Sequence, residues 1–295
     1  MKFTIFEAVD QKSYYSNIID YYEKAEISYK DVWDLNHSMA FHCGFWDHEV
    51  RSIREALLRQ NQIMGEWIGL KEQDHLLDAG CGIGGSAIYL VKNFNCQATG
   101  ISIVPYQIVR ALEKANEHGV HSKTNFKVAD YCDMPFDDNT FSVVWAIESV
   151  CYALDKEAFL KEAFRVLKPG GRLIVADGYR TDRSLDKEEE SIMTKWEEGY
   201  AVHQLATDSI FEDSIAQVGF GSCEIKEATK LVMPSAKRLY YFGLAAIGYR
   251  KLLSLLGKKY GNEVTIRNTQ AAINQYLGIK KGLWKYLVFI AQKPL

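Results

Sequence analysis

A glycine-rich run directly after a short apolar segment is the part of the sequence best suited to bind a ligand. Leu76-Leu77 is followed by Asp78-Ala79-Gly80-Cys81-Gly82-Ile83-Gly84-Gly85, where a helical stretch begins. Glycines at 80 and 82 let the backbone turn tightly and approach a ligand closely, and the first helical turn presents free N–H groups. Such donors suit an anionic ligand group. We therefore expect a cofactor to lie on this loop.

The loop sequence is compatible with more than one class of cofactor. The spacing Gly80-x-Gly82-x-x-Gly85 also fits the dinucleotide fingerprint, so an NAD(P)-dependent oxidoreductase is an alternative. A dinucleotide site has an acid about twenty residues later, on the ribose, whereas here the second apolar run ends in Thr99-Gly100-Ile101-Ser102. Asp78 would instead orient the loop or lie near the ammonium group of a cofactor. A catalytically inactive binding module is a third interpretation.

Three titratable residues are candidates for catalysis. Glu148 follows the apolar run 141–147, so it would lie at the carboxyl end of a strand, where open α/β sheets place their ligands. His42 and His203 lie in segments expected to cover the site, and histidine titrates near neutral pH. A glutamate at a strand end is also often a surface residue, and a lone histidine is often structural. We take Glu148 as the first candidate for a base or an orienting group.

The composition argues against several functions. The chain carries 35 Lys+Arg against 38 Asp+Glu and has no strongly basic half, which argues against a nucleic-acid partner. Its six cysteines are scattered without metal-ligand spacing, so we assign no metal site. Acids within residues 1–10 do not fit a signal peptide, which favours a cytoplasmic location. The longest uncharged apolar stretch, 239–249, is too short to cross a bilayer, although it could touch a lipid-like substrate or a membrane surface.

The centre of the chain alternates between short apolar runs and helical stretches. Apolar runs at 76–77, 98–101, 141–147 and 173–176 are separated by helical stretches at about 86–94, 105–118 and 155–167. This rhythm predicts parallel strands joined by crossover helices. A further core helix is expected at 52–68, and short helices are expected in the aromatic segment 13–46.

One catalytic domain with added segments accounts for these elements. We divide the chain into an N-terminal helical lid (1–50), a core (51–232), a helical cap insertion (233–282) and a final core strand (283–295).

Four ordered motifs together resemble the class I S-adenosylmethionine-dependent methyltransferases. They are the glycine loop, the second strand ending in Ser102, the pair Asp130-Tyr131, and the turn Leu167-Lys168-Pro169-Gly170-Gly171. Within that class the chain is most similar to tocopherol and sterol side-chain methyltransferases, which share a serine or threonine at the position of Ser102 and then a glutamine, here Gln107. The resemblance implies an α/β fold: a Rossmann-like, doubly wound, mostly parallel seven-stranded sheet with helices on both faces.

The resemblance also implies S-adenosyl-L-methionine as the cofactor and a set of residues that bind it. Backbone atoms of Gly80, Cys81 and Gly82 would border its methionine part. Ser102 and Gln107 would hold the ribose hydroxyls. Asp130 would accept from the adenine amino group, with the backbone of Tyr131 beside the ring.

The lid and the cap suggest the nature of the acceptor. An apolar cap suits a lipophilic small molecule, and the resemblance favours an isoprenoid or polycyclic compound of lipid or terpenoid metabolism, methylated at carbon rather than at oxygen or nitrogen. A homodimer is compatible with the sequence. Basic residues of the cap would either bind a phosphate or diphosphate group or form a charged outer face; they are Lys237, Arg238, Arg250, Lys251, Lys258 and Lys259.

Overall fold

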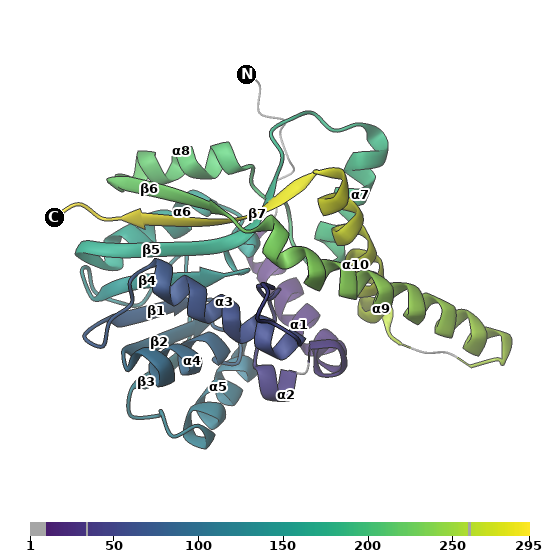
Figure 1. The fold of residues 1–295 in the computed structure, drawn as a ribbon, viewed down its shortest axis with the longest axis horizontal. Coiled ribbons are helices and arrows are strands. Elements are labelled where there is room, and N and C mark those ends of the chain that lie inside the picture. The colour runs from purple at the N-terminus through teal and green to yellow at the C-terminus, as the bar shows by residue number, and fades with distance from the viewer. Residues whose placement is uncertain (1–9, 34, 259–260) are drawn as a thin grey trace.

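A seven-stranded sheet forms the centre of the molecule (Figure 1). The computed structural model describes residues 10–33, 35–258 and 261–295, so Lys259 and residues 1–9 of the expected lid lie outside the described residues. The strand order is β3-β2-β1-β4-β5-β7-β6. The strands are β1 (His75–Ala79), β2 (Gln97–Ser102), β3 (Thr124–Val128), β4 (Phe141–Ile147), β5 (Leu167–Arg180), β6 (Ser222–Glu227) and β7 (Trp284–Gln292).

The first five strands run parallel, and β7 runs antiparallel between β5 and β6. β4 is apolar except for Ser142 because both of its faces are covered: Val143 and Trp145 pack on one side, Val144 and Ala146 on the other. β6 is an edge strand with mostly exposed polar side chains. Its sequence, Ser-Cys-Glu-Ile-Lys-Glu, has no apolar run, so the sequence pattern did not predict it.

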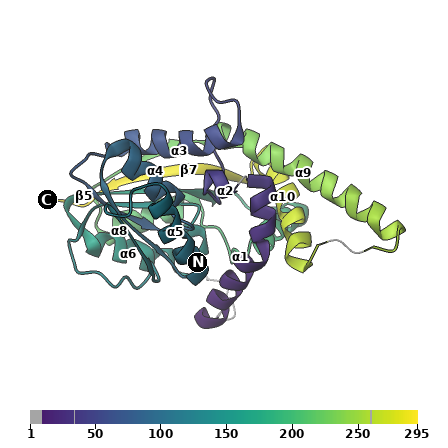
Figure 2. The same cartoon turned by 90° about the horizontal axis from the view of Figure 1, so that it is seen from below.

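Helices cover both faces of the sheet (Figure 2). The helices α3 (Ile53–Trp67), α4 (Gly85–Phe94) and α5 (Pro105–Glu117) belong to one layer, and α6 (Lys156–Val166) and α8 (Asp208–Val218) to the other. The sequence predicted α3, α4, α5 and α6, and the observed bounds of these four helices lie within one or two residues of the expected ones. The doubly wound, mostly parallel α/β fold is therefore confirmed.

The N-terminal segment differs from the expectation of several short helices. It forms one 23-residue helix, α1 (Gln11–Trp33), followed by the four-residue helix α2 (Leu35–Ser38). No glycine or proline interrupts 11–33, and Tyr14, Ile18, Tyr21 and Ala25 recur at helical spacing and are all buried. This single buried face stabilises a continuous helix despite the polar residues between its members.

Three more helices pack together beside the end of the sheet. They are α7 (Lys187–Gly199), α9 (Thr229–Leu255) and α10 (Glu263–Lys281), and α10 packs on α1, α7 and α9. The far half of α9 extends beyond the body of the molecule (Figures 1 and 2). None of the helices in the described ranges is both long and apolar enough to cross a membrane.

Candidate active site

The candidate site lies where the strand order reverses, between β1 and β4. These neighbouring parallel strands pair from Leu76 with Val143 to Asp78 with Trp145. The chain leaves β1 into the glycine loop and α4 on one face of the sheet, and leaves β4 toward the turn η1 (Val150–Tyr152) and α6 on the other. Diverging connections open a crevice at the carboxyl ends of the two strands.

The glycine loop adopts backbone conformations that require glycine. Gly80, Gly82 and Gly84 have φ values of +88°, +53° and +84°, in the left-handed region that other residues rarely adopt. A Cβ on Gly80 would overlap the Ser149 side chain, and a Cβ on Gly82 would lie 3.0 Å from the Phe41 ring. The loop therefore passes closely between η1 and the segment that follows α2.

A first cavity, here called the loop cavity, lies over the glycine loop. Most of the expected binding residues line it: Asp78, Gly80, Cys81, Gly82, Ser102, Gln107 and Tyr131. Ser102 Oγ donates a 2.8 Å hydrogen bond to Gln107 Oε1. Residues 39–42 of the N-terminal segment also line this cavity.

Asp78 is the most unusual residue of the loop cavity. It is only 3% exposed, and its Oδ2 atom has no hydrogen-bond partner among the described residues. Burial raises the pKa of this carboxyl to about 7, partly offset by a hydrogen bond from the Ala87 backbone. A buried, unpaired carboxylate is unfavourable unless a cation pairs with it, so Asp78 suits a ligand that carries an ammonium group.

Asp130 does not line the loop cavity. Its Oδ2 accepts a 2.7 Å hydrogen bond from the Tyr15 hydroxyl of α1, and its Oδ1 accepts one of 2.8 Å from Cys132 N. The neighbouring Tyr131 does line the cavity, and its hydroxyl donates to Ser149 O at 2.8 Å. Asp130 thus anchors α1 at the edge of the loop cavity in this structure.

A second cavity of about 480 Å³, here called the cap cavity, lies between the sheet end and the helices α7, α9 and α10. Its wall is largely apolar and aromatic, including Trp196, Leu239, Phe242 and Trp284. Among the described residues that line it, those of the acidic and basic types are all acids: Glu148, Asp177 and Glu197. Arg180, which does not line the cavity, pairs with Glu197 at 2.7 Å.

The two cavities meet at four residues that line both: Tyr22, Phe41, Glu148 and Tyr152. Tyr22 contacts Phe41 edge-on with ring centroids 5.5 Å apart, and its hydroxyl donates to that of Tyr152 at 3.2 Å. Of these four residues, Glu148 is the carboxylic acid, and it follows β4 directly. Its φ of +45° is a left-handed conformation that is strained for a glutamate.

Glu148 is held by two donors from distant parts of the chain. Its Oε1 atom accepts from Cys43 N at 2.7 Å and from the Tyr286 hydroxyl of β7 at 3.0 Å. Burial raises the pKa of this carboxyl to about 8, and the nearby Asp177 adds to the increase, while the two hydrogen bonds oppose it. A carboxylate with such a pKa is a competent proton acceptor near neutral pH.

The two histidines occupy different environments. His42 is buried beside the loop cavity, and its Nδ1 atom lies 2.7 Å from Cys43 O and 3.1 Å from Gln60 Oε1. Burial lowers the pKa of His42. Gln60 Nε2 in turn donates to Tyr286 at 2.8 Å, so His42 joins the hydrogen-bond chain that ends at Glu148. His203 is exposed, lines neither cavity, and lies edge-on to Tyr14.

Sequence reasoning missed three residues of the site: Gln60, Ser149 and Tyr286. Gln60 and Tyr286 lie 226 positions apart and meet only after folding. Gln60 interrupts the apolar face of α3 and is fully buried there. The polar pair Gln60-Asn61 on a helix face whose other buried residues are apolar or glycine was the signal in the sequence that could have indicated it.

Comparison with known proteins gives the family. The family model described as a methyltransferase domain matches residues 77–175. The chain is 26% identical to tocopherol O-methyltransferase of Arabidopsis thaliana, covering 94% of this chain and 82% of that protein. It is 28% identical to sterol 24-C-methyltransferase of Kluyveromyces lactis, covering 96% and 80%. A further match, 36% identical, is to 27-O-demethylrifamycin SV methyltransferase of Amycolatopsis mediterranei; it covers 51% of this chain and 55% of that protein.

The fold is also that of solved methyltransferases. Geranyl diphosphate C-methyltransferase of Streptomyces coelicolor, solved with S-adenosyl-L-homocysteine, has a TM-score of 0.73 and 17% identity, covering 95% of this chain and 98% of that one. The fold, the glycine loop and the family match define a class I methyltransferase that uses S-adenosylmethionine rather than a nicotinamide cofactor. Within that class, the tocopherol and sterol 24-C-methyltransferases are relatives that the chain matches over most of their length, and the chain is an enzyme.

Replacing Gly82 tests whether the loop holds the cofactor. Gly82→Val should weaken S-adenosylhomocysteine binding by more than about 10-fold in calorimetry, because a branched side chain at positive φ costs about 1–3 kcal/mol and crowds Phe41. Gly119→Val is the matched control, since Gly119 also has positive φ, +69°, but nothing lies within 4 Å of its added Cβ. Equal affinities for the two variants would rule out the loop as the binding element.

The raised pKa of Asp78 predicts how cofactor affinity changes with pH. The carboxyl must lose its proton to pair with an ammonium group, so affinity for S-adenosylhomocysteine should rise as pH increases through about 7. Asp78→Asn should weaken binding about 10-fold or more, because a hydrogen bond to a charged group is worth about 1.5–3 kcal/mol, and should flatten the pH profile. The control Asp177→Asn should keep the slope. A slope that persists in Asp78→Asn would show that another group titrates.

Proposed function

We propose that this enzyme transfers a methyl group to a lipophilic small molecule of isoprenoid or polycyclic type, at carbon in preference to oxygen or nitrogen. The observation that carries the proposal is the cap cavity. It has about 480 Å³ of free volume, a largely apolar wall, and an opening to the loop cavity at Glu148. Pockets of this volume and composition take small apolar ligands with a few polar anchors.

The residues of the loop cavity fit the cofactor. When bound, S-adenosylmethionine supplies a methyl group on a positively charged sulfur. Asp78 would pair with its ammonium group, and the backbone from Gly80 to Gly82 would border the methionine part. Ser102 and Gln107 would turn to the ribose hydroxyls. Asp130 and Tyr131 would lie at the adenine end, with Asp130 exchanging its bond from Tyr15 for one from the adenine amino group.

The junction suits methylation of an electron-rich double bond. The π electrons would form the new carbon–carbon bond as the carbon–sulfur bond breaks, leaving a carbocation that must lose a proton. Three aromatic rings at the junction, those of Tyr22, Phe41 and Tyr152, can stabilise such a cation. The carboxylate of Glu148 then accepts the proton. This need for both rings and a base is why we favour carbon over oxygen or nitrogen.

The charges of the cap cavity favour a neutral acceptor. Among the described residues that line it, Glu148, Asp177 and Glu197 are ionisable acids and none is lysine or arginine. A diphosphate would meet these acids without a compensating cation. Of the basic cap residues, Arg250 donates to Thr269 Oγ1 at 3.0 Å from behind the cavity wall, and Arg238 lies over the Phe242 ring. We therefore do not assign the cap a phosphate site.

The wall formed by α10 offers polar anchors for a hydroxyl group. Gln275 lines the cap cavity, is 5% exposed, and its Oε1 atom has no hydrogen-bond partner among the described residues. Asn268 Oδ1 on the same helix is also buried without such a partner. An unsatisfied buried amide costs about 1–3 kcal/mol, which an acceptor hydroxyl would recover. We therefore expect an apolar acceptor that carries a hydroxyl group.

The role of Glu148 is testable with a panel of unsaturated sterols and prenylated phenols as acceptors. Only the carboxylate form accepts a proton, so turnover should rise with pH through about 8, where the raised pKa of this carboxyl lies. Glu148→Gln should lower kcat about 100-fold or more and abolish this rise. Its affinity for S-adenosylhomocysteine should hardly change.

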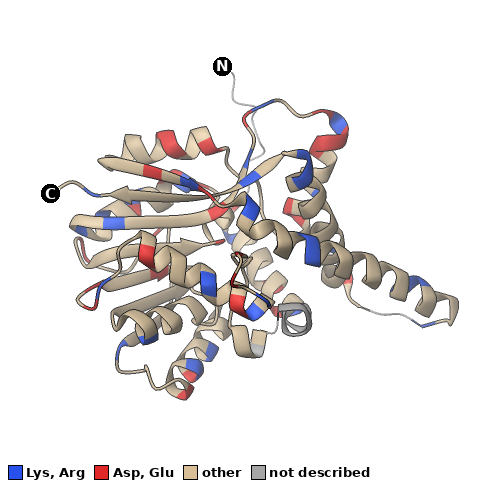
Figure 3. Cartoon of the chain, viewed as in Figure 1, with Lys and Arg blue, Asp and Glu red and all other residues tan. Residues whose placement is uncertain are grey.

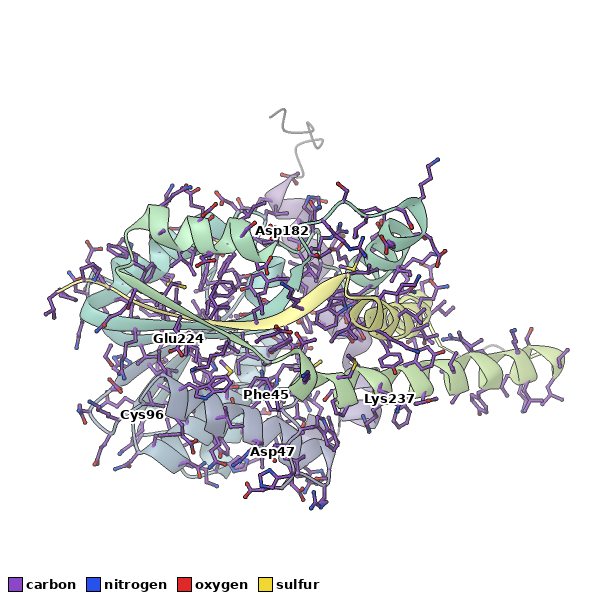
Figure 4. All side chains as sticks on the ribbon, turned by 45° about the horizontal axis from the view of Figure 1, so that its top comes forward. Phe45, Asp47, Cys96, Asp182, Glu224 and Lys237 are labelled. Atoms are coloured by element: carbon purple, nitrogen blue, oxygen red, sulfur yellow. The ribbon has the colours of Figure 1, made fainter. Side chains whose placement is uncertain are left out.

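Glu224→Gln is the matched control, because Glu224 is exposed on the edge strand β6, far from the crevice (Figure 4). It should retain the kcat and pH profile of the wild type. If Glu148→Gln keeps its kcat and raises only the Michaelis constant of the acceptor, Glu148 orients the substrate and is not the base.

A further inference from the structure

The far half of α9 exposes large apolar side chains to solvent. Leu255 is 85% exposed and Leu256 is 64% exposed, and Tyr241, Leu244, Tyr249 and Leu252 are each more than two-fifths exposed. Figures 1 and 2 show this part of the helix extending past the body of the molecule. Aliphatic residues this exposed on a projecting helix mark an interaction surface.

The exposed residues fall on one face of the helix. At about 100° per residue, Tyr241, Leu244, Leu252 and Leu255 lie within a narrow sector, with Tyr249 and Leu256 beside it. These six residues are called the α9 stripe. Arg250 lies on the opposite side of the helix, because it bonds Thr269 of α10. The α9 stripe therefore faces away from the rest of the molecule.

The charge of α9 indicates what the stripe meets. The helix contains five lysine or arginine residues and no acid: Lys230, Lys237, Arg238, Arg250 and Lys251. Figure 3 shows blue segments on α9 with no red, and Figure 4 places Lys237 on the exposed helix. An apolar stripe flanked by basic residues is the pattern of a helix that lies in the interface of an anionic bilayer.

The same helix forms part of the cap cavity. Leu239, Phe242, Gly243 and Ala246 line that cavity and alternate along α9 with members of the α9 stripe. A bilayer in contact with the stripe would thus lie beside the cavity wall. This arrangement brings a source of lipophilic molecules next to the proposed acceptor site.

We propose that the α9 stripe docks this enzyme on the surface of an anionic lipid bilayer, with the helix lying in the interface. The lipid acyl region covers the leucine and tyrosine side chains, and the lipid headgroups meet the flanking lysines. The proposal does not depend on the identity of the methyl acceptor, because bilayer binding is measured without turnover.

Vesicle flotation of the full chain tests the proposal. The protein should float with vesicles of equal phosphatidylcholine and phosphatidylglycerol, and at least about 10-fold less should float with phosphatidylcholine alone. Leu252→Glu/Leu255→Glu should abolish flotation, and Lys237→Glu/Lys251→Glu should reduce it about 10-fold or more, since each basic residue near an anionic surface contributes several-fold. Ile210→Glu is the control, because Ile210 is 61% exposed on α8, away from the stripe.

Binding of S-adenosylhomocysteine shows which variants are folded. Wild-type protein that does not float with either vesicle overturns the proposal, and so does unchanged flotation of a folded Leu252→Glu/Leu255→Glu variant. Sedimentation equilibrium covers the remaining case. Suppose that the wild type is a dimer, that Leu252→Glu/Leu255→Glu dissociates it, and that the wild type does not float. The stripe would then be a contact between two copies of this chain, and the proposal would be overturned.

Discussion

The divergence of β1 and β4 at the sheet's switch point is the constraint on which the site depends. Two paired strands end side by side, yet their chains leave to opposite faces, so no backbone fills the space beyond them. The glycine loop occupies one wall of that space and Ser149 the other, and they approach so closely that Gly80 has no room for a Cβ. The same crevice brings Asp78 and Glu148, which lie at the carboxyl ends of the two strands, to the wall of one cavity.

Burial of several acids in one crevice gives the site its electrostatic character. Desolvation raises the pKa of Asp78 to about 7, of Glu148 to about 8 and of Asp177 to about 6. Each carboxylate is therefore costly until a positive charge arrives. A bound S-adenosylmethionine would bring an ammonium group and a sulfonium close to these acids, whereas the demethylated product would carry only the ammonium group. The acids would therefore bind the reactive cofactor more favourably than its product.

The segment after α2 connects the lid to this chemistry. Cys43 N holds the Glu148 carboxylate, Phe41 lies over Gly82, and His42 connects through Gln60 to Tyr286. Elements from the N-terminus, the core and the last strand therefore meet at one side chain. The strained backbone of Glu148 persists because two donors fix its Oε1 atom.

The sequence was sufficient to predict the elements that local residue patterns determine. The glycine loop, the central strands and the core helices follow from apolar periodicity and turn residues within short windows. The edge strand β6 could not be predicted, because pairing with β7 and not its own composition makes it a strand. The continuous α1 was missed because its stability comes from packing against α10. Gln60 and Tyr286 reach Glu148 only through long-range contacts. His203 is exposed in a bend whose place relative to the site no local pattern specified.

A crystal structure of the enzyme with S-adenosylhomocysteine tests the central claim most directly. The account predicts that the ammonium group lies against Asp78 and that the sulfur faces the opening bordered by Tyr22, Phe41, Glu148 and Tyr152, in contact with the cap cavity. A sulfur directed away from that opening, or separated from the cap cavity by the protein, would contradict the assignment of Glu148 and of the acceptor site together.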